Sequence, residues 1–368
     1  MLIDLPAAPG AAVRVASRLL TLLLAGVLSA CSAAETTAPT GSASVDGSSD
    51  LDSAATTDAD VTTTVDAATI DTAAGSPHDA FTQKDANGDT NTGSPGCGKA
   101  PPKLGSVSAG APGPAWGVNP DYTYTVDVDG VTRSYVLRYP KAYDPKHRYP
   151  VVFLFHGTGG SGAEYDYSGV EQAAPKGAAI FVLPVGLDYA WAKANWPGAK
   201  KMGWETFNDN TRDLDFFDVL WARVQDDYCV DTTRVFASGH SIGGFMTNYI
   251  ACVRGDVLRA VAPISGGGPD PYFLQNQVCA SANVAARVIH GIDDNVVQFA
   301  FGKTSLLYYV KQAGCGSKTI ATTPSPCVRY QGCKAGLPVD MCAFSGVGHS
   351  KFDWPKLGPT IWGFFAGF

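Results

Sequence analysis

The segment 234–246 reads Arg-Val-Phe-Ala-Ser-Gly-His-Ser-Ile-Gly-Gly-Phe-Met, and it decides the expected fold. Its apolar, β-branched start predicts a buried strand, and a helical pattern follows Ser241. Gly239 and Gly243 flank the serine in a Gly-x-Ser-x-Gly motif, where residues without side chains let strand and helix approach closely. A serine on such a sharp turn has a strained backbone and an exposed hydroxyl. We therefore interpret Ser241 as a nucleophile; a tight turn with an inert serine is the alternative.

Other segments predict a sheet around this strand. Short apolar runs typical of buried strands occupy residues 151–155, 179–183, 258–264 and 286–289. Helical spacing of apolar residues occurs at 214–224 and 306–310. The alternation of strand and helix predicts an α/β fold with a mostly parallel central sheet and helices on both faces. At the N-terminal side, Asp129-Gly130 divides two alternating segments and predicts a hairpin of antiparallel strands at 122–128 and 131–139.

A glycine-rich loop follows the 151–155 strand. It reads His-Gly-Thr-Gly-Gly at residues 156–160. Such a loop can point a backbone N–H at the negatively charged oxygen that forms when a serine attacks a carbonyl. We expect the N–H groups of Thr158 and Ile242 to form this oxyanion hole, with a plain tight turn as the alternative.

Two further motifs supply an acid and a base. The segment 290–297, His-Gly-Ile-Asp-Asp-Asn-Val-Val, ends a strand and offers two adjacent carboxylates. We assign the acid to Asp294 and keep Asp293 as the alternative. His349 is the expected base by elimination, since it alone of the six histidines lies downstream of the acid. The order Ser, Asp, His is that of α/β-hydrolases and differs from those of two unrelated protease folds. The sequence thus predicts ester hydrolysis through an acyl-serine.

The N-terminus predicts export. Two arginines precede an apolar run of about ten residues, which is too short for a bilayer that needs roughly 20. The run ends Leu-Ser-Ala-Cys at residues 28–31 and resembles a bacterial lipobox, so we expect 1–30 to be a lipoprotein signal peptide. Cys31 would then carry the lipid that anchors the chain to the cell envelope, in the outer membrane or at the cell surface. Ordinary cleavage, with secretion and a free Cys31, is the alternative.

The amino-acid composition divides residues 31–368 into two parts. Residues 31–96 are rich in Ser, Thr, Ala and Asp and poor in large apolar side chains, which predicts a disordered acidic linker. The catalytic domain is expected at 97–368. The net charge of −7, from 34 acidic and 27 basic residues, argues against a nucleic-acid partner. We expect a monomer. We also expect no metal or cofactor, because the cysteines lack zinc spacing and the linker segment 85–96 lacks the Gly and Glu of a calcium loop.

The catalytic region, from about residue 115 to 368, resembles the carbohydrate esterase family 1 type of secreted esterases. This group comprises feruloyl esterases, acetylxylan esterases and polyhydroxybutyrate depolymerase-like proteins. The matching features are the loop at 156–160, the Cys-Val-Asp of 229–231, the serine turn, the acid loop and Gly348-His349. The cysteine-rich tail at 327–342 looks like that of feruloyl esterases. A departure is that Trp354-Pro355 follows the histidine at a distance rather than within a residue or two.

The resemblance implies an α/β-hydrolase fold and disulfide pairings. With Cys31 lipidated, eight cysteines remain, and an even number in an exported chain predicts disulfides. The family fold implies the pairs Cys229 with Cys252 and Cys315 with Cys342, which leaves Cys327 with Cys333 and Cys97 with Cys279 by default.

The substrate prediction rests on the resemblance and on one long loop. We expect release of feruloyl or acetyl groups from plant cell-wall xylan. The loop after the 179–183 strand carries several aromatic residues, among which Trp191 and Trp204 are candidates for a substrate-binding wall, with packing of the loop as the equal alternative. His240 is a third candidate substrate contact. The alternative functions are a polyester or short-chain esterase and a non-catalytic surface-anchored binding protein.

Overall fold

The computed structural model of the chain describes residues 93–102, 106–107, 122–160, 168–189, 202–206, 210–269, 279 and 284–368. The signal peptide, Cys31, the linker up to residue 92 and Trp191 lie outside these residues, so their assignments stay predictions.

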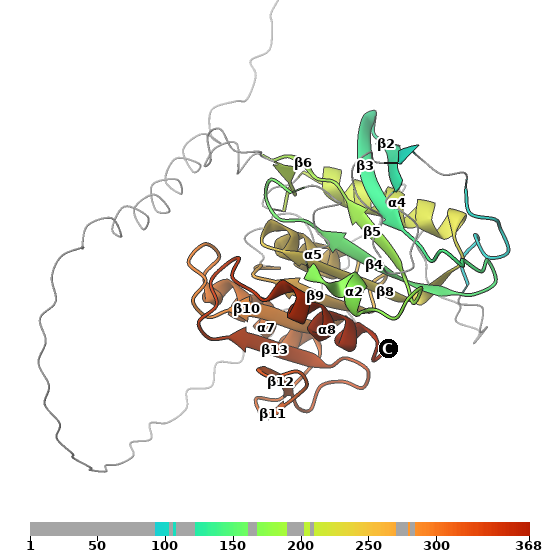
Figure 1. The fold of residues 1–368 in the computed structure, drawn as a ribbon. Helices are drawn as coiled ribbons and strands as arrows, with labels where there is room; N and C mark the ends of the chain where they lie inside the picture. Colours follow the sequence, from blue (N-terminus) through green and yellow to red (C-terminus); the bar gives the residue numbers. More distant parts are fainter. Residues whose placement is uncertain are drawn as a thin grey trace, which may run out of the picture. The chain divides into compact units, whose positions relative to one another are not determined.

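The strands alternate with helices along the chain, as predicted (Figure 1). The strands are β1 (Ser106–Val107), β2 (Tyr122–Val128), β3 (Val131–Arg138), β4 (Tyr149–Phe155), β5 (Ile180–Pro184), β6 (Leu187–Asp188), β7 (Met202–Gly203), β8 (Val230–His240), β9 (Ala260–Ile264), β10 (Ala285–Gly291), β11 (Thr319–Ala321), β12 (Cys327–Tyr330) and β13 (Val339–Phe344). The helices are α2 (Val170–Ala173), α4 (Arg212–Asp227), α5 (Ile242–Val253), α7 (Phe299–Gln312) and α8 (Trp354–Phe365).

Within the described residues, one large sheet has the strand order β1-β2-β3-β5-β4-β8-β9-β10-β13-β12-β11. Its middle, from β5 to β13, is parallel. These strands are apolar and buried on both faces, which explains their near-continuous hydrophobic sequences. The predicted hairpin is confirmed: β2 and β3 pair antiparallel, and Asp129 and Gly130 both take positive φ in the turn. The antiparallel pair β11 and β12 at the other edge was not predicted.

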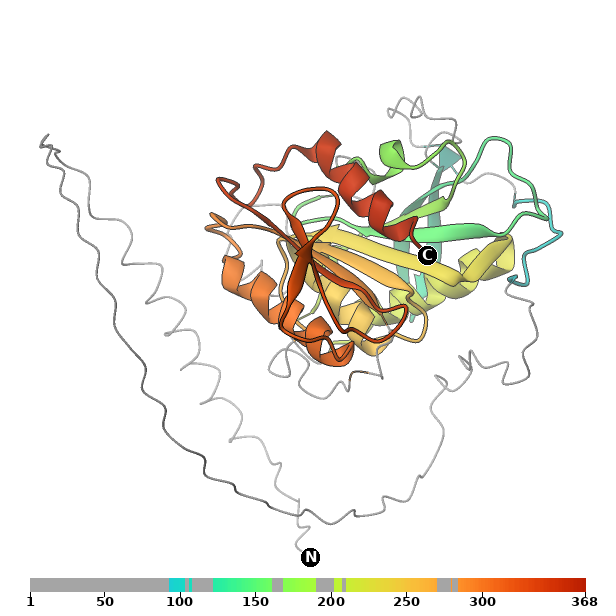
Figure 2. The same cartoon turned by 90° about the horizontal axis from the view of Figure 1, so that it is seen from below.

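The helices cover both faces of the sheet, because neighbouring residues of a strand point to opposite sides. In β4, Val151 and Phe153 belong to one core cluster together with residues of α4, α5 and α7. Val152 and Leu154 belong to a second cluster together with residues of α2 and α8. Figure 2 shows α8, in red, and α7, in orange, on opposite sides of the strands. Among the described helices, none is long and apolar enough to cross a membrane.

The described fold begins a few residues before the predicted boundary at 97. Gly93 forms a bridge with Asp231, and the backbone N–H of Ser94 donates to the carbonyl of Val230 at 3.2 Å. Ser94 is buried, and its hydroxyl donates to the carbonyl of Tyr228. Residues 93–96 therefore pack beside the start of β8.

All eight cysteines of the catalytic region form disulfides, but none of the four expected pairings is right. The bonds join Cys97 to Cys229, Cys252 to Cys279, Cys315 to Cys333 and Cys327 to Cys342.

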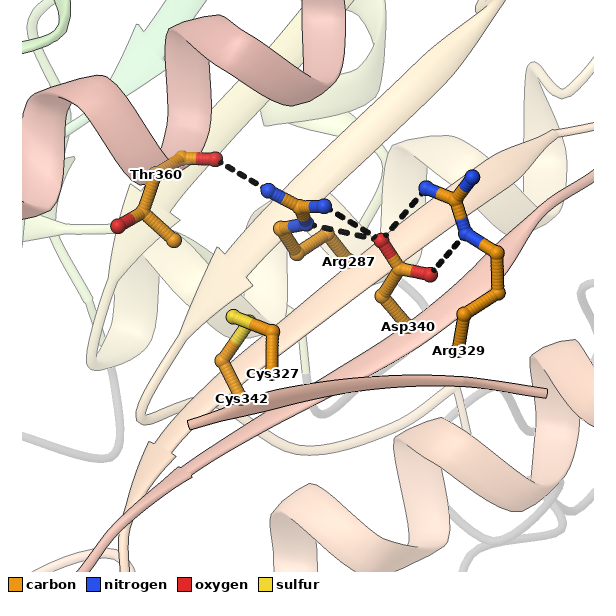
Figure 3. The surroundings of a disulfide bond; sticks show 6 residues. All are labelled: Arg287, Cys327, Arg329, Asp340, Cys342 and Thr360. Atoms are coloured by element: carbon orange, nitrogen blue, oxygen red, sulfur yellow. Dashed lines mark hydrogen bonds and ion pairs between the residues drawn. A yellow bond between two sulfur atoms is a disulfide. The ribbon is translucent and has the colours of Figure 1, made fainter. Parts of the chain in front are cut away.

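The packing of distant segments against each other explains two of these pairings. Residues 93–97 run beside the start of β8, which places Cys97 next to Cys229. In the unpredicted β12, Cys327 lies directly opposite Cys342 in the antiparallel register with β13 (Figure 3).

Candidate active site

The four sequence motifs meet at one edge of the sheet. β8 ends directly before Ser241, β10 ends before the acid loop, and β13 ends before the segment that carries His349. β4 ends before the glycine-rich loop 156–160. Because these strands are parallel, their carboxyl ends lie at the same edge, where ligand sites of open α/β sheets are found.

The turn at Ser241 is as sharp as its glycines predicted. Ser241 has φ 60° and ψ −125°, a conformation that L-residues rarely adopt. A Cβ atom on Gly239 would collide with the backbone of Gly243, and a Cβ on Gly243 would collide with the carbonyl of Phe155. The glycines are thus required where β8, α5 and β4 approach one another, and the turn presents the serine hydroxyl at the sheet edge.

The structure brings Ser241, His349 and Asp294 together in one hydrogen-bond chain. Nδ1 of His349 lies 2.8 Å from Oδ2 of Asp294, and Nε2 lies 2.9 Å from Oγ of Ser241. The carboxylate can only accept, so Nδ1 carries the hydrogen and Nε2 is left to accept from the serine hydroxyl. This tautomer is the one that a general base for Ser241 requires.

The acid loop keeps Asp294 ionised. Oδ1 of Asp294 accepts the backbone N–H groups of Val296 and Val297, each at 2.9 Å. Burial of this carboxyl favours its neutral form, but the hydrogen bonds and the charge of His349 outweigh burial, so the pKa of Asp294 is below its ordinary value. The ionised carboxylate of Asp294 therefore stabilises the folded chain at pH values above its unfolded-state pKa. This stabilisation is lost as the pH falls through the lower folded-state pKa of Asp294.

Asp293 has different hydrogen-bond partners from Asp294. Its Oδ2 accepts the backbone N–H of Gly346 at 2.7 Å, and its own N–H donates to the carbonyl of Val347 at 3.2 Å. Both bonds hold the segment between β13 and His349, in which Gly346 takes a positive φ. Asp293 thus anchors the loop of the histidine, and only Asp294 bonds the imidazole.

A second histidine supports the acid loop, a role that the sequence reasoning missed. His290 is fully buried, and its Nε2–H donates to the carbonyl of Val297 at 2.8 Å. Burial lowers the pKa of His290, which keeps the ring neutral. Its position at the end of a buried strand, four residues before Asp294, was the available signal.

The glycine-rich loop lies against the serine turn. A Cβ atom on Gly157 would lie 3.6 Å from Cβ of Ser241. The side chain of Thr158 is engaged by Tyr189, with their hydroxyl oxygens 2.7 Å apart. Within the described part of the chain, no backbone carbonyl accepts from the N–H of Thr158 or Ile242. These are the two donors assigned to the oxyanion hole.

Buried hydrogen bonds hold the glycine-rich loop in place. The imidazole of His156 accepts the N–H of Gly186 at 2.9 Å through Nε2, so its Nδ1–H donates to the carbonyl of Gly157 at 2.7 Å. The indole N–H of Trp204 donates to the carbonyl of His156 at 2.9 Å.

Two candidate substrate contacts are corrected by their burial. Trp204 is fully buried against Phe155 and His156, so it packs the loop onto the domain and lines no open wall. His240 is 5% exposed and contacts the backbone of His349, which leaves it little surface for substrate. The third candidate, Trp191, lies outside the described residues. The packing alternative holds for Trp204.

The sheet, the serine turn and the order of the site residues define an α/β-hydrolase fold. A family model described as "Putative esterase" matches residues 131–283. Feruloyl esterase D of Neurospora crassa is 32% identical over 72% of this chain and 93% of its own length. Feruloyl esterase C of Emericella nidulans is 33% identical over 65% of this chain and 84% of its own length. The chain therefore belongs to the esterase family of these relatives.

A solved structure agrees with this fold. The acetyl xylan esterase from Aspergillus awamori superposes with a TM-score of 0.50 at 17% identity, covering 66% of this chain and 99% of that one.

Proposed function

We propose that the chain is an exported serine carboxylesterase that releases feruloyl or acetyl groups from plant cell-wall xylan. The observation that carries the chemistry is the hydrogen-bond chain from Ser241 through His349 to Asp294. The substrate class is supported by the family relatives, which are feruloyl esterases. Export is supported by the four disulfides of the catalytic region and by the lipobox-like sequence before Cys31.

The reaction follows from the geometry. The hydroxyl oxygen of Ser241 attacks the ester carbonyl carbon while Nε2 of His349 takes the hydroxyl proton. The N–H groups of Thr158 and Ile242 stabilise the resulting oxyanion, and Asp294 stabilises the imidazolium. Collapse breaks the bond to the alcohol, which leaves with the proton from His349. Water, deprotonated by the same imidazole, then attacks the acyl-serine. His349 returns this proton to the oxygen of Ser241 as the bond to the acyl group breaks and the acid leaves.

Hydrolysis of three esters by the full chain tests both parts of this proposal. The substrates are methyl ferulate, an acetylated xylan and a hydroxybutyrate oligomer. We expect kcat/KM for methyl ferulate to exceed that for the oligomer by at least about tenfold, and Ser241→Ala to lower kcat about 10⁴-fold or more.

The two outcomes against the proposal differ in meaning. A preference for the hydroxybutyrate oligomer that still depends on Ser241 would assign the chain to polyester breakdown. Absence of any Ser241-dependent hydrolysis would contradict enzymatic function and leave a binding protein on a hydrolase fold.

A further inference from the structure

His240 bonds the main chain of the proposed base. It is the last residue of β8 and directly precedes Ser241. Its Nε2 lies 2.8 Å from the backbone carbonyl oxygen of His349. A carbonyl oxygen only accepts hydrogen bonds, so Nε2 of His240 carries the hydrogen. This hydrogen bond joins β8, which ends directly before the nucleophile, to the loop that carries the base. Nε2 of that base, His349, lies 2.9 Å from the hydroxyl oxygen of Ser241.

The ring of His240 also packs against the rings of His349 and Trp354. Its centroid lies 4.7 Å from the ring of His349 and 5.0 Å from the ring of Trp354, which meets it edge-on at 82°. Trp354 begins α8, so the segment between β13 and α8 is held against β8 by these contacts. A Cβ atom on Gly157 would lie 3.6 Å from Nδ1 of His240. His240 thus contacts the base and lies beside the proposed oxyanion loop.

The surroundings keep this histidine neutral. Burial, reinforced by the neighbouring His349, lowers the pKa of His240 to about 3, although the hydrogen bond to His349 and the charge of Asp294 act in the other direction. His290 adds a smaller lowering effect. A neutral ring leaves the hydrogen on Nε2 and places no second positive charge beside His349 when that residue takes the serine proton.

We propose that His240 is a positioning residue, whose Nε2–H holds the main chain of His349 so that the base stays aligned with Ser241. This rests on the hydrolysis proposed above and gives a role to a residue that is almost completely buried. Misplacement of a reacting group by about 1 Å can cost about 100-fold in rate, so loss of this bond should be visible in kcat.

Three replacements in the full chain separate positioning from packing. In His240→Gln, the amide nitrogen can occupy the place of Nε2 and donate to the carbonyl of His349. In His240→Asn, the same amide is one methylene shorter and falls short. His240→Leu fills the space without a donor. We expect the glutamine variant to keep kcat for methyl ferulate within about threefold, and the other two to lose about 10- to 100-fold with KM within about threefold.

A matched control and a pH profile complete the test. His147→Gln makes the same chemical change at an exposed site beside Tyr149 and should leave kcat unchanged. The profile of kcat/KM against pH should keep its acid limb in His240→Gln, because residue 240 is not the group that titrates. If the leucine variant does not fold, the comparison of Asn with Gln decides alone.

Three results would overturn the inference. They are wild-type kcat in the asparagine variant, an equal loss in the glutamine and asparagine variants, and disappearance of the acid limb in His240→Gln. A wild-type chain without ester hydrolysis would instead refute the proposed function, so the two failures are distinguishable.

Discussion

Asp294→Asn is expected to lower kcat for ester hydrolysis by about 10³- to 10⁴-fold while the chain stays folded. An asparagine amide can donate to Nδ1 of His349, whereas the carboxylate only accepts from it. The imidazole would then carry its hydrogen on Nε2 and could no longer accept the proton of Ser241. Steady-state kinetics with methyl ferulate, with thermal unfolding as the folding check, measure this effect.

The neighbouring carboxylate is the matched control. In Asp293→Asn, the side-chain carbonyl can still accept the N–H of Gly346, which lies 2.7 Å from Oδ2. We expect a loss of less than about tenfold in kcat, since the loop keeps its anchor. The same large loss in both variants, or the larger loss in Asp293→Asn, would contradict the assignment of the acid to Asp294.

The second large effect concerns stability. Figure 3 shows Asp340 of β13 between Arg287 and Arg329, with Arg287 reaching the carbonyl of Thr360. Asp340 is fully buried; its Oδ2 lies 2.7 Å from Nη2 of Arg287, and its Oδ1 lies 2.7 Å from Nε of Arg329. Asp340→Asn would leave the buried guanidinium of Arg287 without its counter-charge. We expect the free energy of unfolding to fall by about 3–5 kcal/mol, measured by urea denaturation.

A more exposed ion pair provides the comparison. Arg223 and Asp227 pair on α4, where their side chains are 54% and 19% exposed. Asp227→Asn makes the same chemical change in this partly solvated pair and should cost less than about 1 kcal/mol. Equal losses in the two variants would show that the Asp340 cluster contributes no more than a surface pair.

The fold and the residues that meet in the site could be predicted from local sequence patterns. Strand, glycine turn and helix around Ser241 are consecutive in the chain, so the pattern alone contains the geometry. The alternating hairpin around Asp129-Gly130 is local in the same sense. His349 could be chosen because few histidines compete and only one follows the acid.

What sequence reasoning missed depends on contacts between distant segments. Cys327 pairs with Cys342 because β12 lies antiparallel to β13, and β12, with four residues, is too short to be recognised as a strand. Asp293 and Asp294 are adjacent, and only the path of the loop around Gly346 separates their roles. Trp204 is buried against Phe155 and His156, and the latter is 48 residues away in the sequence.

Covalent labelling of the full chain with a fluorophosphonate tests the central claim most directly, because the reagent phosphonylates only a serine that is activated by a base. We expect mass spectrometry to find one adduct, on the peptide that contains Ser241, with no adduct there in Ser241→Ala and a rate at least about 100-fold lower in His349→Ala. An adduct on another residue, or equal labelling rates with and without His349, would contradict the account.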